Sequence, residues 1–326
     1  MLTSALQMIR DRTIAVVKAS MARALLVATM LLWAELAAAG SILFIGNSFD
    51  YAEGSPVQFY RADTVTDLND EGIGGVPALF KAFSAQAGLS YDVYLETHPD
   101  AGLDWHLEHK SALLSQRPFD QVVMHGYSIL DKDKPGDPTL LLSTVKQMSA
   151  LLRARNPAVE VRLIATWPRA DQLYTPKGAW AGKSAEAMAH DIRAAYDRAA
   201  AETPAVKAVI PVGEAWVRAI QQGIAAPNPY LGIGPGMVDL WTYDNYHASA
   251  YGYYLDALVL FGNLTGLDPR SLGANECAGF ELGFSREQVS ALQRVAFEQL
   301  KSSGTLHGAP LEVAPTERAG RCPAHP

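Results

Sequence analysis

The sequence has few of the features that mark metal-binding, nucleic-acid-binding or repeat proteins. Among its 326 residues are only two cysteines, Cys277 and Cys322, and two scattered thiols lack the spacing of zinc ligands. Lysine and arginine form no cluster and the formal net charge is −7, so no nucleic-acid partner is expected. The sequence also lacks internal repeats and low-complexity linkers, which favours one large domain.

A long hydrophobic run is also missing. The most apolar segment, residues 24–36, spans about 13 residues, whereas a membrane-spanning helix needs about 20. Arg23 precedes this run and small residues follow it, which is the pattern of a signal peptide. We therefore predict a signal peptide over residues 1–39, with Met21 as an alternative start, and export to the periplasm or the cell exterior without a remaining membrane span. An uncleaved N-terminal anchor is the alternative.

The two cysteines can form a disulfide if the protein is exported. Oxidising compartments favour disulfides, so Cys277 and Cys322 are predicted to pair, with two unrelated thiols as the alternative. Such a bridge would hold the irregular tail over residues 304–326, which is rich in Gly, Pro and Ala, against the domain predicted for residues 40–303.

Short apolar runs alternate with longer helical patterns along most of the chain. The runs predict buried strands at residues 42–45, 91–95, 121–124, 159–166 and 205–212. Apolar residues at helical spacing predict helices over residues 77–87, 139–155, 184–202, 248–266 and 285–302. This alternation predicts an α/β fold, with a parallel five-stranded sheet in a three-layer α/β/α sandwich of the flavodoxin-like type. Two connections are long, at residues 49–75 and 223–243, and long irregular segments are often functional.

The first candidate for chemistry is the sequence Gly46-Asn47-Ser48, which follows the first predicted strand. A serine placed directly after a buried strand lies at the edge of the sheet where parallel α/β folds bind ligands. Since Gly, Asn and Ser all form turns readily, a simple turn is the alternative.

The second candidate is the pair Asp244 and His247, just before the helix predicted from residue 248. Serine is a weak nucleophile that needs a base, and histidine suits this role because it titrates near neutrality. An aspartate three residues earlier can fold back and hold one ring nitrogen. The simpler interpretation is that Asp244 is a helix N-cap and His247 a surface residue.

Together these motifs resemble the SGNH, or GDSL-like, hydrolase superfamily over residues 41–266. The first block of the superfamily is Gly-Asp-Ser in most members, and a Gly-Asn-Ser-Phe sequence like the one here occurs in a branch of bacterial members. The last block, Asp-x-x-His, matches Asp244 and His247. The resemblance implies that Ser48 is the nucleophile, His247 the base and Asp244 its partner, with no metal and no cofactor.

The resemblance also implies an oxyanion hole with two backbone donors, the N–H groups of Ser48 and Gly102. The third donor is usually an asparagine in a Gly-x-Asn block after the third strand, but this sequence has Ser128 in that place. Because the loss of one donor costs about 10²–10³ in rate, the change bears on rate more than on mechanism. The substrate pocket is expected to be lined by Asn47, His125, Tyr127 and Trp167. Arg169 and Asp171, after the fourth strand, are expected either to shape this pocket or to cap the sheet.

We therefore expect a serine-dependent hydrolase that works through an acyl-enzyme on a small-molecule or polysaccharide ester. A short acyl group is preferred, because no wide apolar segment suggests a fatty-acyl channel, and the resemblance implies O-acetyl groups on carbohydrate as one such substrate. Two alternatives remain. One is acyl transfer to a sugar hydroxyl by the same triad, and the other is an inactive carbohydrate-binding protein, which the change at Ser128 would permit.

Overall fold

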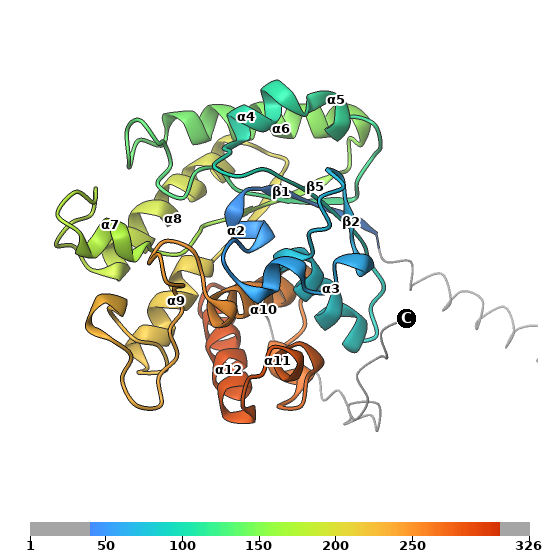
Figure 1. The fold of residues 1–326 in the computed structure, drawn as a ribbon. Helices are drawn as coiled ribbons and strands as arrows, with labels where there is room; N and C mark the ends of the chain where they lie inside the picture. Colours follow the sequence, from blue (N-terminus) through green and yellow to red (C-terminus); the bar gives the residue numbers. More distant parts are fainter. Residues whose placement is uncertain (1–39, 307–326) are drawn as a thin grey trace, which may run out of the picture. The chain divides into compact units, whose positions relative to one another are not determined.

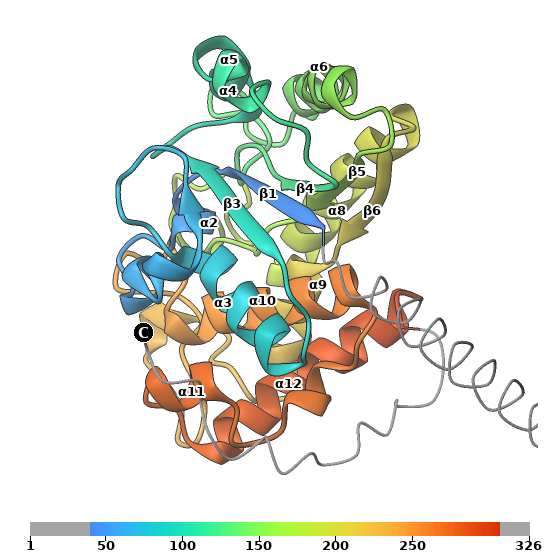
Figure 2. The ribbon, with the colours of Figure 1, turned by 90° about the vertical axis from the view of Figure 1, so that its right-hand side faces the viewer.

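A parallel sheet forms the centre of the described structure. The computed structural model describes residues 40–306, so the predicted signal peptide and most of the predicted tail, including Cys322, lie outside the described residues. The disulfide between Cys277 and Cys322 therefore stays a prediction. Within residues 40–306, six parallel strands lie in the order β2-β3-β1-β4-β5-β6. Figure 2 shows the strands from β3 to β6. The strands are Ser41–Gly46 (β1), Thr66–Asp67 (β2), Asp92–Thr97 (β3), Gln121–Met124 (β4), Glu160–Ile164 (β5) and Val206–Ile210 (β6).

All five predicted strands are present, so the predicted α/β fold class is confirmed. The predicted number of strands is one too low, because β2 pairs with β3 inside the long connection over residues 49–75. A strand of two residues has no alternation pattern, and only its place beside β3 makes it a strand.

Helices cover both faces of the sheet (Figure 1). On one face, Ile42 and Phe44 of β1 pack with α3, α9, α10 and α12; on the other, Leu43 and Ile45 pack with α4, α6 and α8. A strand that is buried on both sides needs the continuous apolar sequence that β1 has. The longer helices are Gly75–Gln86 (α3), Thr139–Arg155 (α6), Ala185–Glu202 (α8), Val212–Gln221 (α9), Ala250–Thr265 (α10) and Arg286–Ser302 (α12). The shorter ones are Ser48–Tyr51 (α2), Leu103–His109 (α4), Ser111–Leu114 (α5), Ala170–Tyr174 (α7) and Cys277–Glu281 (α11).

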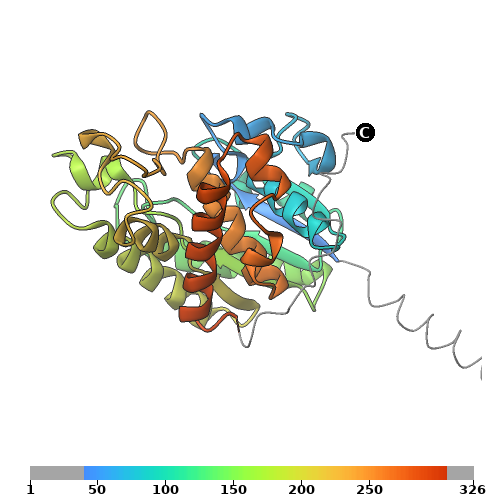
Figure 3. The ribbon, with the colours of Figure 1, turned by 90° about the horizontal axis from the view of Figure 1, so that it is seen from below.

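The five predicted helices correspond to α3, α6, α8, α10 and α12. Serine side chains fix the starts of three of them, because Ser184, Ser249 and Ser285 accept backbone N–H groups at the first turns of α8, α10 and α12. Helix α9 was not expected, since the last strand was predicted to run to residue 212 but ends before Pro211. Seen from below, α12 crosses in front of the helices on which it packs (Figure 3). In the part of the chain that the structure describes, none of the helices is both long and apolar enough for a membrane span.

The carboxyl ends of the central strands lie at one edge of the sheet. Strand β1 lies between β3 and β4, so the order of strands along the chain reverses direction at β1. Open parallel sheets bind ligands at such a switch point, outside the carboxyl ends of the strands. The segments after β1, β3, β4 and β5 therefore meet where a binding site is expected.

Candidate active site

The turn after β1 is held by the side chain of Asn47. Its Oδ1 accepts the backbone N–H of Phe49 at 3.1 Å and caps the short helix α2, which begins at Ser48. Its Nδ2 donates to the carbonyl oxygen of Ala101 at 2.8 Å and to that of Gly126 at 3.5 Å. Asn47 thus joins the serine turn to the segments that follow β3 and β4.

Asp244 and His247 form a closed local structure. Oδ2 of Asp244 lies 2.6 Å from Nδ1 of His247, and Oδ1 accepts the backbone N–H groups of Tyr246 and His247, each at 2.9 Å. The N-cap of α10 is Ser249, so the simpler interpretation of Asp244 as a helix cap is wrong. Burial disfavours the charged carboxylate, but the hydrogen bonds from His247 and Tyr246 outweigh it and lower the pKa of Asp244 below its ordinary value.

Phe49 and Tyr253 connect the serine turn with the aspartate–histidine pair. The ring of Phe49, next to Ser48, lies edge to face with the His247 ring, with 5.9 Å between the ring centres. The hydroxyl of Tyr253 on α10 donates to the carbonyl oxygen of Ser48 at 3.1 Å. Nε2 of His247 is buried and has no hydrogen-bond partner among residues 40–306. The lone pair of Nε2 is therefore unoccupied, and Ser48 Oγ is not hydrogen-bonded to it in this structure.

The ring of Tyr246 packs on the rings of Phe49 and His247, and its sequence position did not single it out. Burial raises the pKa of Tyr246, while the charge of Arg169 and a hydrogen bond with the Ser48 side chain lower it. The guanidinium carbon of Arg169 lies 3.5 Å from the centre of the Tyr246 ring. The backbone carbonyl of Tyr246 accepts the indole N–H of Trp167 at 3.2 Å. The Asp-x-x-His spacing draws attention to the ends of the motif, and only the fold shows that this middle residue packs against Phe49, next to Ser48.

The two remaining oxyanion candidates each have a close partner. A Cβ atom on Gly102 would overlap the ring of Tyr127, so this position has space only for glycine. Burial raises the pKa of Tyr127, and a hydrogen bond from the Gly102 backbone opposes this effect. The Oγ of Ser128 accepts a hydrogen bond from Nη1 of Arg169 at 3.2 Å. The Gly102 backbone thus lies against the Tyr127 side chain, and the Ser128 hydroxyl accepts a hydrogen bond from a cation.

A buried charge cluster lies beneath the serine turn. Nε2 of His125 lies 3.0 Å from Oδ2 of Asp50, and both side chains are 1% exposed. Burial lowers the pKa of His125, but the charge of Asp50 and further hydrogen bonds outweigh it and raise the value. Asp256 on α10 is buried beside them, and burial together with the charge of Asp50 raises its pKa well above the ordinary value. The cluster thereby links α2, the end of β4 and α10.

Two residues that were expected to line the substrate pocket lie beneath the site instead. His125 is enclosed in the charge cluster. Trp167 is fully buried because its ring stacks on Phe49, with 3.8 Å between ring centres, and on Trp216, with 5.0 Å. Both side chains support the site from below and have almost no surface to offer a ligand. Tyr127 is also largely buried, against Gly102.

Gly46 is enclosed by buried polar side chains on two sides. Its carbonyl oxygen is 2.9 Å from Nε2 of His106, whose other ring nitrogen pairs with the buried carboxylate of Glu96. A Cβ on Gly46 would overlap Oδ2 of Asp50 and lie 2.5 Å from Nε2 of His125. The first residue of the motif must therefore be glycine, because Asp50 and His125 occupy the space of a side chain.

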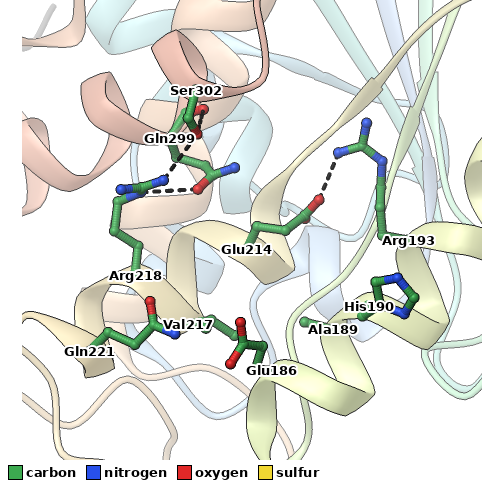
Figure 4. Close-up of a pocket in the computed structure, with 10 residues that line it drawn as sticks. All are labelled: Glu186, Ala189, His190, Arg193, Glu214, Val217, Arg218, Gln221, Gln299 and Ser302. Atoms are coloured by element: carbon green, nitrogen blue, oxygen red, sulfur yellow. Dashed lines mark hydrogen bonds and ion pairs between the residues drawn. The ribbon is translucent and has the colours of Figure 1, made fainter.

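Two surface pockets lie elsewhere on the molecule. One of about 280 Å³, between α8, α9 and α12, is lined by Arg193, Glu214 and Arg218 among others (Figure 4). Another, of about 390 Å³, lies between α4 and α6. No candidate catalytic residue lines either pocket. Within residues 40–306, no group of three or more His, Cys, Asp or Glu side chains is placed to hold a metal ion.

Comparison with solved structures identifies the fold. The chain is similar to a DUF4886 family protein from Bacteroides uniformis, with a TM-score of 0.58 and 16% sequence identity, over 81% of this chain and 95% of that one. The two chains share a fold.

Further similar structures have TM-scores below 0.5. They include a family 3 carbohydrate esterase from Clostridium thermocellum, with a TM-score of 0.45 and 15% identity over 68% of this chain and 94% of that one. They also include the esterase EstA from Pseudoalteromonas, with a TM-score of 0.43 and 13% identity over 69% of this chain and 96% of that one. Two other matches in this range are named for an SGNH hydrolase and a GDSL-like lipase. No protein-family model and no curated protein matches the sequence.

Proposed function

We propose that this protein is a serine ester hydrolase in which Ser48, His247 and Asp244 form the catalytic triad. His247 Nε2 accepts the proton of Ser48 Oγ while that oxygen forms a bond to the acyl carbon. The resulting tetrahedral intermediate expels the alcohol, which takes the proton from His247, and an acyl-enzyme remains. Water then attacks the acyl group with His247 again as base, and the carboxylic acid leaves.

The observation that carries this proposal is the state of the two nitrogens of His247. Nδ1 faces the Asp244 carboxylate at 2.6 Å, so the proton of a neutral ring is held on that side. Nε2 is thereby left as the acceptor, and it is buried without a hydrogen-bond partner in the described structure. The packing of Phe49 on the same ring supports a position of Ser48 beside it.

A short acyl group on a carbohydrate suits the surroundings best. The side chains at the base of the site are closely packed aromatic rings, which leave little space for a long chain. Tyr243, directly before Asp244, is 85% exposed and offers a flat ring on which the apolar face of a sugar can pack. The predicted signal peptide supports a substrate outside the cytoplasm.

Release of p-nitrophenol from acetyl, butyryl and longer esters tests the proposal on the mature protein. Wild type should be most active on the acetyl ester, and Ser48→Ala should lower kcat/KM by at least about 10³-fold, as in other triads. Ser149→Ala is the matched control, because Ser149 on α6 is a buried serine with no hydrogen-bond partner for its Oγ. Activity that survives in Ser48→Ala would refute the triad.

The same assay separates the two alternatives. Addition of a free sugar distinguishes acyl transfer, in which acetylated sugar appears at the expense of acetate. An inactive binding protein would release no p-nitrophenol from any ester in wild type or variant. The departure at Ser128 is the feature that would favour this last outcome.

A further inference from the structure

Arg169 is fixed beside the candidate active site by three contacts. Its Nε and Nη2 donate to the two carboxylate oxygens of Asp171, at 2.9 and 2.6 Å. Its guanidinium lies over the ring of Tyr246, which packs against Phe49 next to Ser48. The remaining nitrogen, Nη1, donates to Oγ of Ser128 at 3.2 Å. The fork to Asp171 and the stacking on Tyr246 together set the direction in which Nη1 points.

The contact with Arg169 determines what the Ser128 hydroxyl can do. A serine hydroxyl has one proton to donate and two lone pairs that accept. Since a guanidinium only donates, Ser128 is the acceptor in this contact and its own proton is directed elsewhere. A hydrogen bond from a charged donor is stronger than one from a neutral donor, and it polarises the O–H bond of the acceptor. Ser128 is therefore a better donor than a serine on its own.

We propose that Arg169 and Ser128 together replace the oxyanion-hole asparagine that the superfamily usually has after its third strand. This inference rests on the proposed function. Ser128 donates its hydroxyl proton in a hydrogen bond to the oxygen that becomes negative in the tetrahedral intermediate. Arg169 acts through Ser128 as a positioning residue that orients the hydroxyl and brings a positive charge behind it. No proton is transferred to or from either residue.

A direct role for Arg169 in holding an anionic substrate suits the structure less well. Its side chain is 12% exposed, and two of its three nitrogens are already used by Asp171. Its charge is partly compensated by that carboxylate. Nη1, the nitrogen that Asp171 does not hold, donates to Ser128.

The test is a double-mutant cycle on the full mature enzyme with p-nitrophenyl acetate. Arg169→Met and Ser128→Ala should each lower kcat by about 10–10³-fold with little change in KM, the range expected for one oxyanion donor. The double variant should be no slower than the worse single variant, because the two side chains act as one unit. Arg193→Met is the matched control. It removes an arginine that is likewise held by carboxylates, here those of Asp197 and Glu214, but lines the pocket between α8, α9 and α12.

A second variant separates catalysis from a structural role. Ser128→Asn restores the amide of the superfamily, so Arg169→Met should cost little in that background if Arg169 acts through Ser128. Losses that multiply in the double variant, or a full loss in the Ser128→Asn background, would overturn the inference, because Arg169 would then act through Tyr246 or the fold. Equal kcat values for wild type and Arg169→Met would overturn it as well. If Ser48→Ala is dead while Arg169→Met is fully active, the hydrolase stands and only the role of Arg169 is refuted, whereas an active Ser48→Ala refutes both.

Discussion

Nδ1 of His247 lies 2.6 Å from Oδ2 of Asp244, and Oδ1 of the same carboxylate accepts the backbone N–H of His247 at 2.9 Å. One carboxylate therefore holds both the ring and the backbone of the histidine. Because Asp244 precedes His247 by three residues, this arrangement is complete within one turn of chain and needs no partner from elsewhere in the fold. It explains how the turn before α10 can hold the histidine ring in one orientation.

Asp244→Asn should lower kcat by about 10³–10⁴-fold and leave the fold intact. The Asn Oδ1 can still accept the backbone N–H groups, so the turn is kept. Its amide N–H₂ would face Nδ1 of His247, and the neutral ring would then place its proton on Nε2, where Ser48 needs an acceptor. Steady-state kinetics and circular dichroism of the variant measure the two effects.

The pH dependence of stability gives a separate check on Asp244. Its folded-state pKa is lowered, so the stability that it contributes is present above its ordinary pKa of about 3.9 and is lost as the pH falls through the folded value. Wild type and Asp244→Asn should therefore converge in stability in acid. A variant with normal kcat, or one that differs from wild type equally at all pH values, would contradict the assigned role.

Asn47→Asp should weaken the enzyme although aspartate is the commoner residue of the superfamily at this position. The Nδ2 of Asn47 donates to the carbonyl oxygens of Ala101 and Gly126, and a carboxylate has no proton to donate there. Two buried acceptors would lose their partner next to a negative charge, at a cost of about 1–3 kcal/mol. Urea unfolding at neutral pH and kcat/KM measure the loss.

Acidification supplies the control for this substitution. Protonation of the new carboxyl group restores one donor, so the deficit of Asn47→Asp in the free energy of unfolding should shrink as the pH falls toward 4. A variant as stable as wild type at neutral pH would show that the Asn47 amide faces the opposite way from that in the structure.

The parts of the fold that depend on continuous local pattern could be predicted from the sequence. The five longer strands, five of the six longer helices and the serine N-cap of α8 all have such a pattern, whereas α9 was missed. The short strand β2 and the helices of four to seven residues have too little sequence for a periodicity, and they form because the sheet edge and the strand ends place them. Contacts with the rest of the fold decide whether such short elements form.

The candidate site also has residues that the sequence indicates and residues that only the fold brings to it. The motif residues Ser48, Asp244 and His247 could be named because turn, spacing and chemistry coincide in a few residues. The partners of the site come from remote segments, and no spacing in the sequence connects Arg169 with Ser128 or Asp256 with His125. Burial of Trp167 under Phe49 is also a property of packing alone, and for this reason its assignment to the pocket wall was wrong.

Gly46→Ala should destabilise the protein and impair activity together. Its new Cβ would overlap Oδ2 of Asp50 and come within 2.5 Å of Nε2 of His125, so the buried pair would have to separate. Overpacking of a core usually costs about 1–3 kcal/mol, and we expect the upper part of that range because two charged groups are displaced. Denaturant unfolding measures the loss.

Gly126→Ala is the matched control for Gly46→Ala. Its Cβ would meet Cδ1 of Leu141 at 3.3 Å, and the end of a leucine side chain can move a few tenths of an ångström. Its loss of stability should be clearly smaller than that of Gly46→Ala. Equal losses would mean that Asp50 and His125 rearrange easily, and that the cluster does not restrict the serine turn.

Asp256→Asn should leave the stability in mild acid almost unchanged and raise it at alkaline pH relative to wild type. The pKa of Asp256 is raised well above its ordinary value by burial and by the charge of Asp50, while His125 opposes the shift. The folded state thus keeps a proton that the unfolded chain loses above pH of about 4, so the free energy of unfolding falls with rising pH by up to about 1.4 kcal/mol per unit until the folded group titrates. Asparagine has the same shape and cannot ionise, so this part of the decline should vanish.

His125 has a raised pKa as well, and its contribution, which is complete below about pH 6.5 and lost as the pH rises through the folded value, should remain in the variant. Urea unfolding curves from pH 5 to pH 10 measure both slopes, with Asp92→Asn at the exposed start of β3 as the control that keeps the wild-type curve. Parallel curves for wild type and Asp256→Asn would show that Asp256 is ionised in the folded protein, and that the cluster beneath Ser48 holds its charges in a different arrangement.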